Sequence, residues 1–338
     1  MQAIKRHYLL ALAFLLLIAL FSSLFIGRYA ISPLDVSRLI RAQLTGMDSG
    51  LAPAAHTAFF TIRLPRIIGT VFVGGGLAAA GAVFQGVFKN PMSSPDILGS
   101  SAGSGLGAAI GILLAFPIVP VQIMSFAGGL LAVAVTCGIS YSIERRNVSP
   151  LTLVLTGLVA ASIFNAGISL TKYVADPSNT LPAITFFLLG TFSSVGTGAI
   201  LPLAILITAS LIPMLLLRWK LSVLSMGDEE ALTMGVNSGL LRGVMILCAT
   251  VITSTTVSFC GIIGWVGLVV PHLARMIVGS NYVKLLPASI LLGASFTLVV
   301  DNIARSLLSF ELPIGILTAL MGAPFFLILL KRGKRGWA

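Results

Sequence analysis

Arg63-Leu64-Pro65-Arg66-Ile67 opens the stretch that decides the fold, because it sets two cations and a proline at the start of 22 uncharged residues, Ile67 to Phe88. Only 9% of the 338 residues are charged and 57% are hydrophobic, whereas a soluble protein carries roughly 25% charged residues. So few charges cannot cover a water-facing surface. The chain is therefore expected to be an integral membrane protein, and the basic pair beside a spanning helix is interpreted as a docking site for an acidic partner.

Uncharged stretches long enough to span, about 17 to 25 residues, recur along the sequence. Two of them need dividing: Leu181–Leu217 into a partial segment and a helix from about Gly196, and Gly243–Ala274 into a helix followed by a broken one. We predict an all-α membrane protein with ten transmembrane helices, a broken eighth helix, short partial helices, and a single domain over residues 1–338. The other spans are Tyr8–Ile26, Ile67–Phe88, Ile97–Pro117, Val119–Ile143, Val148–Thr171, Leu285–Val300 and Leu312–Leu330.

The basic residues predict the orientation. Ten spans put both termini on one side, and a cytoplasmic N-terminus places two-thirds of the 21 Lys and Arg residues inside, as the positive-inside rule requires. The net charge of +11 is explained in this way rather than by nucleic acid, because these residues form no basic face with interleaved aromatics. The residues placed inside are Lys5, Arg6, Lys89, Arg145, Arg146, Arg218, Lys220, Arg242, Arg275, Lys284, Lys331, Arg332, Lys334 and Arg335.

The first apolar stretch is interpreted as an uncleaved signal anchor, with a cleaved signal peptide as the alternative. Its 19-residue run, Tyr8–Ile26, exceeds the usual 7 to 15 residues of a signal peptide, and no clear Ala-x-Ala site follows. Glycines at every fourth residue from Gly103 to Gly111 share one helix face and favour close helix packing. Gly261, Gly264 and Pro271 are expected to interrupt a helix at membrane depth, where protein or a cavity must cover the freed backbone.

Several kinds of chemistry are disfavoured. Gly99 to Gly103 fits the G-x-S-x-G pattern of hydrolases, but it opens a membrane helix, and the base that Ser101 would need could come only from distant His272. No phosphate-binding loop is present, the three cysteines show no paired spacing, and no metal site or catalytic residue is expected. Ionisable residues inside the spans are almost absent, which disfavours a secondary transporter or channel. Asp301 and Arg305 are expected to form an ion pair.

One predicted cytoplasmic loop carries helix signals. Asp228 is a candidate N-cap, the next two glutamates favour a helix N-terminus, and Gly235 suits a C-terminal cap. We therefore expect a short amphipathic helix displayed on the inner surface and held in a partner's groove by the apolar anchors Ala231, Leu232 and Met234. The loop residues assigned to this coupling are Gly227, Asp228, Glu229, Glu230, Ala231, Leu232, Met234 and Gly235.

At this point the chain resembles the permease subunits of ABC importers for ferric siderophores, haem and cobalamin (FecCD-type). The resemblance covers nearly the whole chain in order. It rests on R-L-P-R at 63–66, Lys89-Asn90-Pro91-Met92 through Pro95-Asp96-Ile97-Leu98-Gly99, the G-D-E-E-A loop at 227–231, Gly267-Leu268-Val269-Val270-Pro271-His272-Leu273-Ala274-Arg275, Asp301 with Ala304-Arg305, and Glu311-Leu312-Pro313-Ile314-Gly315 through Gly322-Ala323-Pro324-Phe325-Phe326.

The resemblance implies a multi-pass permease of the bacterial cytoplasmic membrane, working as a homodimer or with a paralogue. Its partners are two cytoplasmic ATPase subunits, which bind ATP and Mg, and an extracytoplasmic binding protein. Arg63, Arg66 and Arg305 correspond to arginines that meet the binding protein in the similar cobalamin permease, and the loop 227–235 corresponds to the coupling helices. The inner gate falls at Pro150 and Leu151. The substrate favoured is a ferric siderophore, with haem, cobalamin or an oxyanion such as molybdate as alternatives.

Overall fold

The computed structural model describes residues 2–144 and 148–333. Within these residues every regular element is a helix, which confirms the predicted all-α class. Arg145, Arg146, Lys334 and Arg335, which entered the orientation prediction, lie outside the described residues. The helices are α1 (Gln2–Phe25), α2 (Pro33–Thr45), α3 (Pro53–His56), η1 (Thr57–Arg63), α4 (Leu64–Val87), η2 (Pro95–Leu98), α5 (Ser100–Leu113), α6 (Ile118–Ile143), α7 (Pro150–Val174), α8 (Thr180–Leu188), α9 (Thr197–Leu216), α10 (Arg218–Leu224), α11 (Asp228–Thr233), α12 (Ser238–Cys260), α13 (Val266–Val278), α14 (Tyr282–Ser306) and α15 (Ile314–Gly333).

The expected spans are found. In the described part of the chain, seven helical segments are long and apolar enough to cross a membrane, and the shorter apolar helices α5, α13 and α15 bring the total to the ten expected. The partial segment expected before the sixth span is α8, and the sixth span itself is α9. The division of the uncharged run 243–274 was also right, because α12 ends at Cys260 and α13 starts at Val266.

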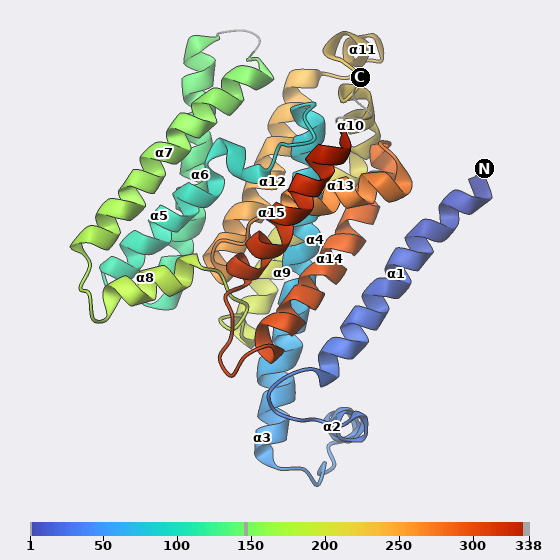
Figure 1. Ribbon diagram of the computed structural model, residues 1–338, viewed down its shortest axis with the longest axis vertical. Helices are drawn as coiled ribbons and strands as arrows, with labels where there is room; N and C mark the ends of the chain where they lie inside the picture. Colours follow the sequence, from blue (N-terminus) through green and yellow to red (C-terminus); the bar gives the residue numbers. More distant parts are fainter. Residues whose placement is uncertain (1, 145–147, 334–338) are drawn as a thin grey trace.

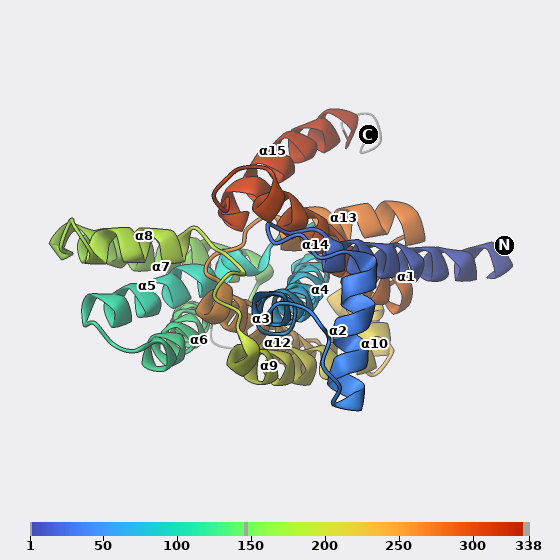
Figure 2. The ribbon, with the colours of Figure 1, turned by 90° about the horizontal axis from the view of Figure 1, so that it is seen from below.

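Helix α4 is the central helix of the bundle. Figures 1 and 2 show it surrounded by α9, α12, α13 and α14, with α1 along one edge and α5 to α8 grouped on the other side. Nearly all of its residues are buried, although its sequence is uniformly apolar rather than amphipathic. A helix that is apolar all round is typical of a buried core position or a membrane span, and α4 is both.

Small residues set how closely the helices approach. A Cβ atom built on Gly74 of α4 would lie 2.5 Å from the carbonyl oxygen of Gly293 on α14, and one built on Gly293 would lie 2.4 Å from that of Gly74. On α5, Gly107 is similarly close to the backbone of Met124 on α6. The glycine face from Gly103 to Gly111 therefore packs against a helix of the same chain, which agrees with its interpretation as a packing feature.

Two helix boundaries differ from expectation. The helix carrying R-L-P-R begins about three turns before Arg63, as α3 continues through the π-helical turn η1 into α4. In η1 the amide of Leu64 bonds to the carbonyl oxygen five residues earlier, on Phe59. The expectation that Pro271 breaks a helix is wrong, because α13 runs through it from Val266 to Val278. The break lies at residues 261–265, where Gly261 and Trp265 both have positive φ.

The two ends of the bundle are distinct. In Figure 1 α10, α11 and the C-terminal end of α15 lie toward the upper end, α1 begins in the upper half, and α2 and α3 lie at the lower end. Helix α2 runs across that lower end, and its apolar side packs on Phe59 of η1. The arrangement matches the predicted topology, in which the termini and the loop 226–236 share the cytoplasmic side.

Candidate functional site

At the outer end, Arg66 holds two carboxylates at once. Its Nε lies 3.0 Å and its Nη2 2.8 Å from Asp301 Oδ1 on α14, while Nη1 lies 3.0 Å from each oxygen of Glu311. Asp301 is fully buried and Arg66 is only 4% exposed. Bidentate pairing of this kind is what allows a guanidinium and a carboxylate to be buried together. The cluster therefore ties α4 to α14 and to the segment before α15.

Arg305 joins the same cluster from one helical turn further along α14. Its Nε lies 3.4 Å from Asp301 Oδ2, which confirms the predicted i, i+4 ion pair. Its Nη2 donates to Asn302 Oδ1 and, at 3.3 Å, to the carbonyl oxygen of Ser23 on α1. Asn302 Nδ2 in turn donates to Ser23 Oγ at 2.8 Å. These bonds connect α14 to α1, which otherwise sits at the edge of the bundle.

Arg63 is used differently, as a clamp on backbone carbonyl groups. Its Nη1 lies 2.6 Å from the carbonyl oxygen of Leu24, and its Nη2 lies 2.8 Å from that of Tyr29. Carbonyl groups at the C-terminal end of a helix have no intrahelical partner. Arg63 therefore satisfies the end of α1 and fixes the chain where it leaves that helix.

The three arginines predicted to meet a binding protein are thus 4%, 4% and 5% exposed, for Arg63, Arg66 and Arg305 in that order. Docking at these residues stays a prediction, and their burial adds a condition: contact with a partner requires their internal hydrogen bonds to open. Exposed cations are present at the same end, at Arg28 before α2 and at Arg38 and Arg41 on α2.

The predicted short helix at the inner end is α11. It closes with a Schellman motif: the amide of Gly235, at φ 71°, bonds to the carbonyl oxygen of Leu232, and that of Val236 to the carbonyl oxygen of Ala231. The expected C-terminal role of Gly235 is confirmed. The expected N-cap is not, because Gly227 occupies that position and no side chain caps the helix.

Asp228 instead connects three segments. Its Oδ1 accepts from Arg242 Nη2 at 2.5 Å and from Lys89 Nζ at 3.3 Å. The hydrogen bond from Arg242, assisted by both positive charges, holds the pKa of Asp228 below its ordinary value. Asp228 therefore fixes α11 to α12 and to the end of α4, which is a positioning role rather than a capping one.

The expected apolar anchors divide into two kinds. Leu232 is 75% exposed and Met234 is also exposed, as a surface for a partner requires. Ala231 is fully buried and packs with Val236 in the core of this chain, so the expectation that it enters a partner's groove is wrong. Two further exposed apolar residues, Met226 before α11 and Leu240 after it, were missed by sequence reasoning because both lie outside the helix that it considered.

The residues assigned to the gate lie at the start of α7. Pro150 is the first helical residue, after Ser149 as N-cap, whose side chain accepts from the amide of Thr152 at 3.1 Å. Glu144 at the end of α6 accepts from the amide of Ser149 at 2.5 Å and from Thr152 Oγ1 at 2.6 Å, and these bonds hold its pKa below the ordinary value. Leu151 is exposed on the next position. The start of α7 is therefore fixed to the end of α6, while the side chain of Leu151 remains exposed.

Comparisons with known proteins agree with this geometry. A family model described as the FecCD transport family matches residues 15–332. The chain belongs to the FecCD transport family. This FecCD permease is 38% identical to the molybdate import system permease protein MolB of Haemophilus influenzae, over 97% of this chain and 96% of that protein. It is 37% identical to the Fe(3+)-citrate import system permease protein YfmE of Bacillus subtilis, over 96% of this chain and 94% of that one.

A solved structure supports the fold of the FecCD permease as well. A chain of a metal-chelate type ABC transporter in an inward-facing conformation superimposes with a TM-score of 0.85 at 36% identity, covering 96% of this chain and 98% of that one. The protein is therefore a permease subunit of an ABC importer, a multi-pass protein of the bacterial cytoplasmic membrane. Its family is a transport family, and ATP hydrolysis belongs to separate subunits.

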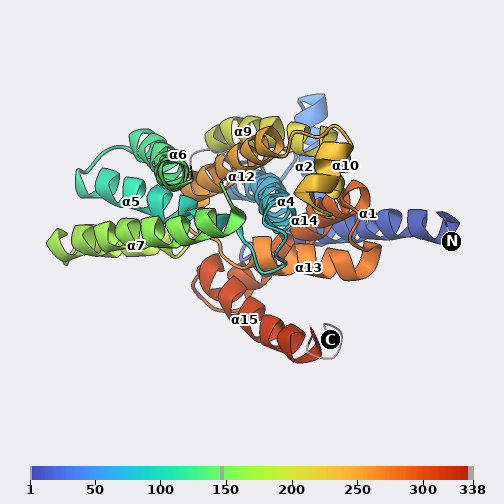
Figure 3. The same cartoon turned by 90° about the horizontal axis from the view of Figure 1, so that it is seen from above.

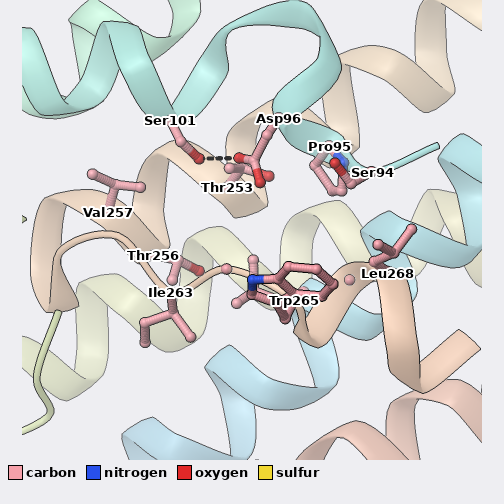
Figure 4. A pocket seen from close by; sticks show the side chains of 13 residues that line it. Ser94, Pro95, Asp96, Ser101, Thr253, Thr256, Val257, Ile263, Trp265 and Leu268 are labelled. Atoms are coloured by element: carbon pink, nitrogen blue, oxygen red, sulfur yellow. Dashed lines mark hydrogen bonds between the residues drawn. The ribbon is translucent and has the colours of Figure 1, made fainter. Parts of the chain in front are cut away.

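Sequence reasoning missed most of the partners in these clusters. Glu311 and Lys89 lie far in sequence from the residues that they bind, so no local pattern could have paired them. Asp96 was missed for a different reason: it immediately precedes the uncharged stretch that begins at Ile97 and was not counted as lying within a span. It faces a cavity between the helices, shown in Figure 4, where Ser101 donates to its Oδ1. The expectation that carboxylates are almost absent at membrane depth was therefore incomplete.

Proposed function

We propose that this permease carries a ferric siderophore inward along the exposed face of α7. Residues spaced three and four apart share one face of a helix, and six exposed residues of α7 follow that spacing. Toward the inner end they are apolar, and toward the outer end they are neutral hydrogen-bonding groups. The six are Leu151, Leu155, Leu158, Ser162, Asn165 and Ser169.

This stripe is the observation that carries the proposal. The hydroxyl groups of Ser162 and Ser169 donate to backbone carbonyls of α7, so their lone pairs remain available, and Asn165 offers both a donor and an acceptor. A ferric siderophore presents a large, weakly polar surface with oxygen atoms, which suits neutral contacts of this kind. Leu151, beside Pro150, supplies an apolar constriction at the inner end, consistent with a gate at these two residues.

A second candidate substrate is molybdate, because the MolB relative named above is a molybdate import permease. The α7 stripe favours the chelate. A divalent oxyanion is normally held by cations or by several directed N–H donors, and the stripe offers one amide group and no cation. Haem and cobalamin are also large and partly apolar, so measured uptake of each compound distinguishes them from a siderophore.

We further propose that two permeases pair through the side of the bundle formed by α7, α13 and α15. Figure 3 shows these helices along one side, with α15 projecting from it. Helix α15 packs on α13 and α14, while Leu320 and Leu327 remain exposed. Pairing two copies, or a copy and a paralogue, would enclose the α7 stripe in a central path.

The two ends supply the proposed partner sites. At the inner end, the exposed patch around Leu232 and Met234 is proposed to sit in a groove of an ATPase subunit that binds ATP and Mg. At the outer end, the binding protein is proposed to meet Arg28, Arg38 and Arg41 first, because their side chains are exposed. Arg63, Arg66 and Arg305 lie in the same end and are proposed to engage only when the internal cluster opens.

The test of the substrate is uptake into vesicles that contain this permease, its ATPase subunits and its binding protein. ATP-dependent accumulation of a radioactive ferric siderophore, without accumulation of molybdate, is expected. Replacing Asn165 with Leu should lower the uptake rate roughly tenfold, about 1.4 kcal/mol, through loss of hydrogen bonds in the path. Ser142→Ala, an exposed position at the inner end of α6, is the control and should leave uptake unchanged. Accumulation of molybdate alone would reject the siderophore.

The test of docking is the affinity of the loaded binding protein for the permease. Arg38→Glu with Arg41→Glu should weaken binding at least tenfold, and the wild-type affinity should fall as the salt concentration rises, because exposed charges are screened. Arg63→Met should leave the initial affinity nearly unchanged, since its guanidinium is buried. An effect of Arg63→Met as large as that of the α2 double variant, in protein of normal stability, would show direct contact with the buried arginines.

A further inference from the structure

A cavity of about 250 Å³ lies where η2, α4, α5, α12 and α13 meet. Its depth in the membrane follows from the helices that line it. Leu77, on its wall, is midway along α4. The cavity therefore lies inside the membrane region of the bundle, next to residues 261–265, which separate α12 from α13.

Asp96 brings a negative charge to this cavity. Its side chain is exposed to the cavity rather than packed against other residues. In Figure 4, Asp96 and Ser101 lie on one side of the cavity, and Thr256 and Trp265 lie on the other. Among the residues that the structure describes in the lining there is no cation, and the hydrogen bond given to the carboxylate comes from Ser101.

The contrast with Asp301 shows what Asp96 lacks. Asp301 is fully buried among helices, but Arg66 and Arg305 neutralise it. An ionised group within the membrane is costly unless it is paired. The hydrogen bond from Ser101, at the start of α5, is the contact that the described lining gives to the Asp96 carboxylate. A cation from outside the chain would supply the counter-charge that Asp301 receives from its arginines and that the described cavity lining does not give Asp96.

The oxygen atoms around Asp96 define the chemistry of that ligand. Thr253 Oγ1 donates its hydrogen to the carbonyl oxygen of Ala249, and Thr256 Oγ1 to that of Ile252, each at 2.9 Å. The hydrogen of Ser101 is given to Asp96. These three hydroxyl oxygens are left with lone pairs as acceptors. An all-oxygen set suits a hard cation, and a single carboxylate matches a single positive charge.

We propose that this cavity binds one alkali metal cation, with Asp96 as its charged ligand and the hydroxyl oxygens of Ser101, Thr253 and Thr256 around it. The site does not depend on the transported substrate, since it lies beside the core helix α4 and not on the α7 stripe. It touches the break between α12 and α13 through Trp265, which has φ 69° and packs edge-on against Phe326 of α15. A cation bound there would act on residues 261–265, which connect α12 to α13 and contact α15 through Trp265.

The experiment uses the full-length permease in lipid nanodiscs at constant pH and ionic strength. Bound radioactive Na⁺ should be displaced by unlabelled NaCl but not by choline chloride, at about one ion per chain, and displacement by KCl, compared with that by NaCl, ranks the two ions. Asp96→Asn, which keeps the shape and removes the charge, should weaken binding at least tenfold. Thr253→Val should weaken it several-fold. Asp48→Asn, an exposed carboxylate of the outer loop, is the matched control and should bind like the wild type.

A second readout is the fluorescence of Trp265 in a chain whose other two tryptophans, Trp219 and Trp337, are replaced by Phe. Its emission should change with NaCl and saturate, and this change should disappear in Asp96→Asn. Binding that is absent from the wild type, or that persists in Asp96→Asn, overturns the proposal. An emission change that follows pH identically in NaCl and choline chloride also overturns it, because the ligand would then be a proton. If Asp96→Asn does not fold, the wild type and Thr253→Val decide.

Discussion

The outer and inner ends of this permease use the same ingredients, arginines and aspartates, in opposite ways. At the outer end Asp301 is fully buried between Arg66 and Arg305, and Arg66 is shared with Glu311. At the inner end Asp228 is 47% exposed between Lys89 and Arg242. A buried ion pair is held by low dielectric surroundings and directed hydrogen bonds, whereas an exposed one is weakened by water and salt.

The difference shows how firmly the helices are held together at each end. The outer cluster joins α1, α4, α14 and the segment before α15, so its charges fasten helices together and leave little for a partner. The inner end leaves Leu232 and Met234 exposed, and α11 is held there by the packing of Ala231, by the ion pairs of Asp228 and by its C-terminal cap. The predictions below are ordered by the size of the effect expected from this contrast.

The largest effect is expected for Asp301→Asn. It leaves Arg66 and Arg305 without their shared buried counter-charge, which typically costs about 3–5 kcal/mol of folding stability. Thermal unfolding of the purified permease in mild detergent measures the loss. The matched control is Asp228→Asn at the inner end, which should cost less than about 1 kcal/mol because that pair is exposed. Equal losses at the two ends would contradict the contrast drawn above.

The next effect concerns partner binding and not folding. Leu232→Asp should leave the permease stable, because Leu232 is exposed in the free chain. It should lower association of the ATPase subunits by more than tenfold, about 1.4 kcal/mol, since an unpaired charge would enter an apolar groove. Co-purification of the ATPase and stimulation of ATP hydrolysis by loaded binding protein are the measurements. The control is Thr233→Asp, at the adjacent exposed residue. If Leu232→Asp assembles normally with the ATPase subunits, the loop is a linker and does not couple the two subunits.

A smaller effect is expected at the end of α11. Gly235 has φ 71°, so Gly235→Ala should destabilise the loop by about 1 kcal/mol. Because the loop carries the proposed coupling surface, protease sensitivity between α10 and α12 should rise. Gly243→Ala is the control, since Gly243 lies within α12 and an added Cβ there meets no atom within 4 Å. Similar protease sensitivity of the two variants would remove the role of the Schellman motif.

The smallest effect is a pH dependence of the inner end. The pKa of Asp228 is lowered in the folded chain, so its stabilising contribution is complete above its ordinary pKa of 3.8 and is lost as the pH falls below that value toward the folded-state pKa. Hydrogen exchange of α11 amides, measured between pH 6 and pH 3 and corrected for intrinsic exchange rates, should show reduced protection at the acidic end. In Asp228→Asn this change should be much smaller. The same trend in both proteins would assign it to another group.

Several features could be predicted from the sequence because they depend on local composition. The low charge and the long apolar stretches determine a membrane protein, and the spacing of stretches gives ten spans, with a break near Gly261. The helix signals around Gly235 are local as well, and the cap forms as expected. The family could be identified because its motifs stand in order along the chain. Hydropathy and backbone preference act over a few residues, so they can be read before the chain is folded.

Only the tertiary structure decided which charges are buried and what they contact. Arg66 and Asp301 are 235 residues apart in sequence, and Arg66 and Glu311 are 245 apart, so no periodicity could show that they neutralise each other. For the same reason Ala231 and Leu232, neighbours in one short helix, separate into a core residue and a surface residue. Asp96 lies in the short segment between α4 and α5, outside the uncharged stretches. Only the packing of α5, α12 and α13 around it places its carboxyl group at membrane depth. A charged side chain acquires its role from the groups that fold around it, and those groups come from distant parts of the chain.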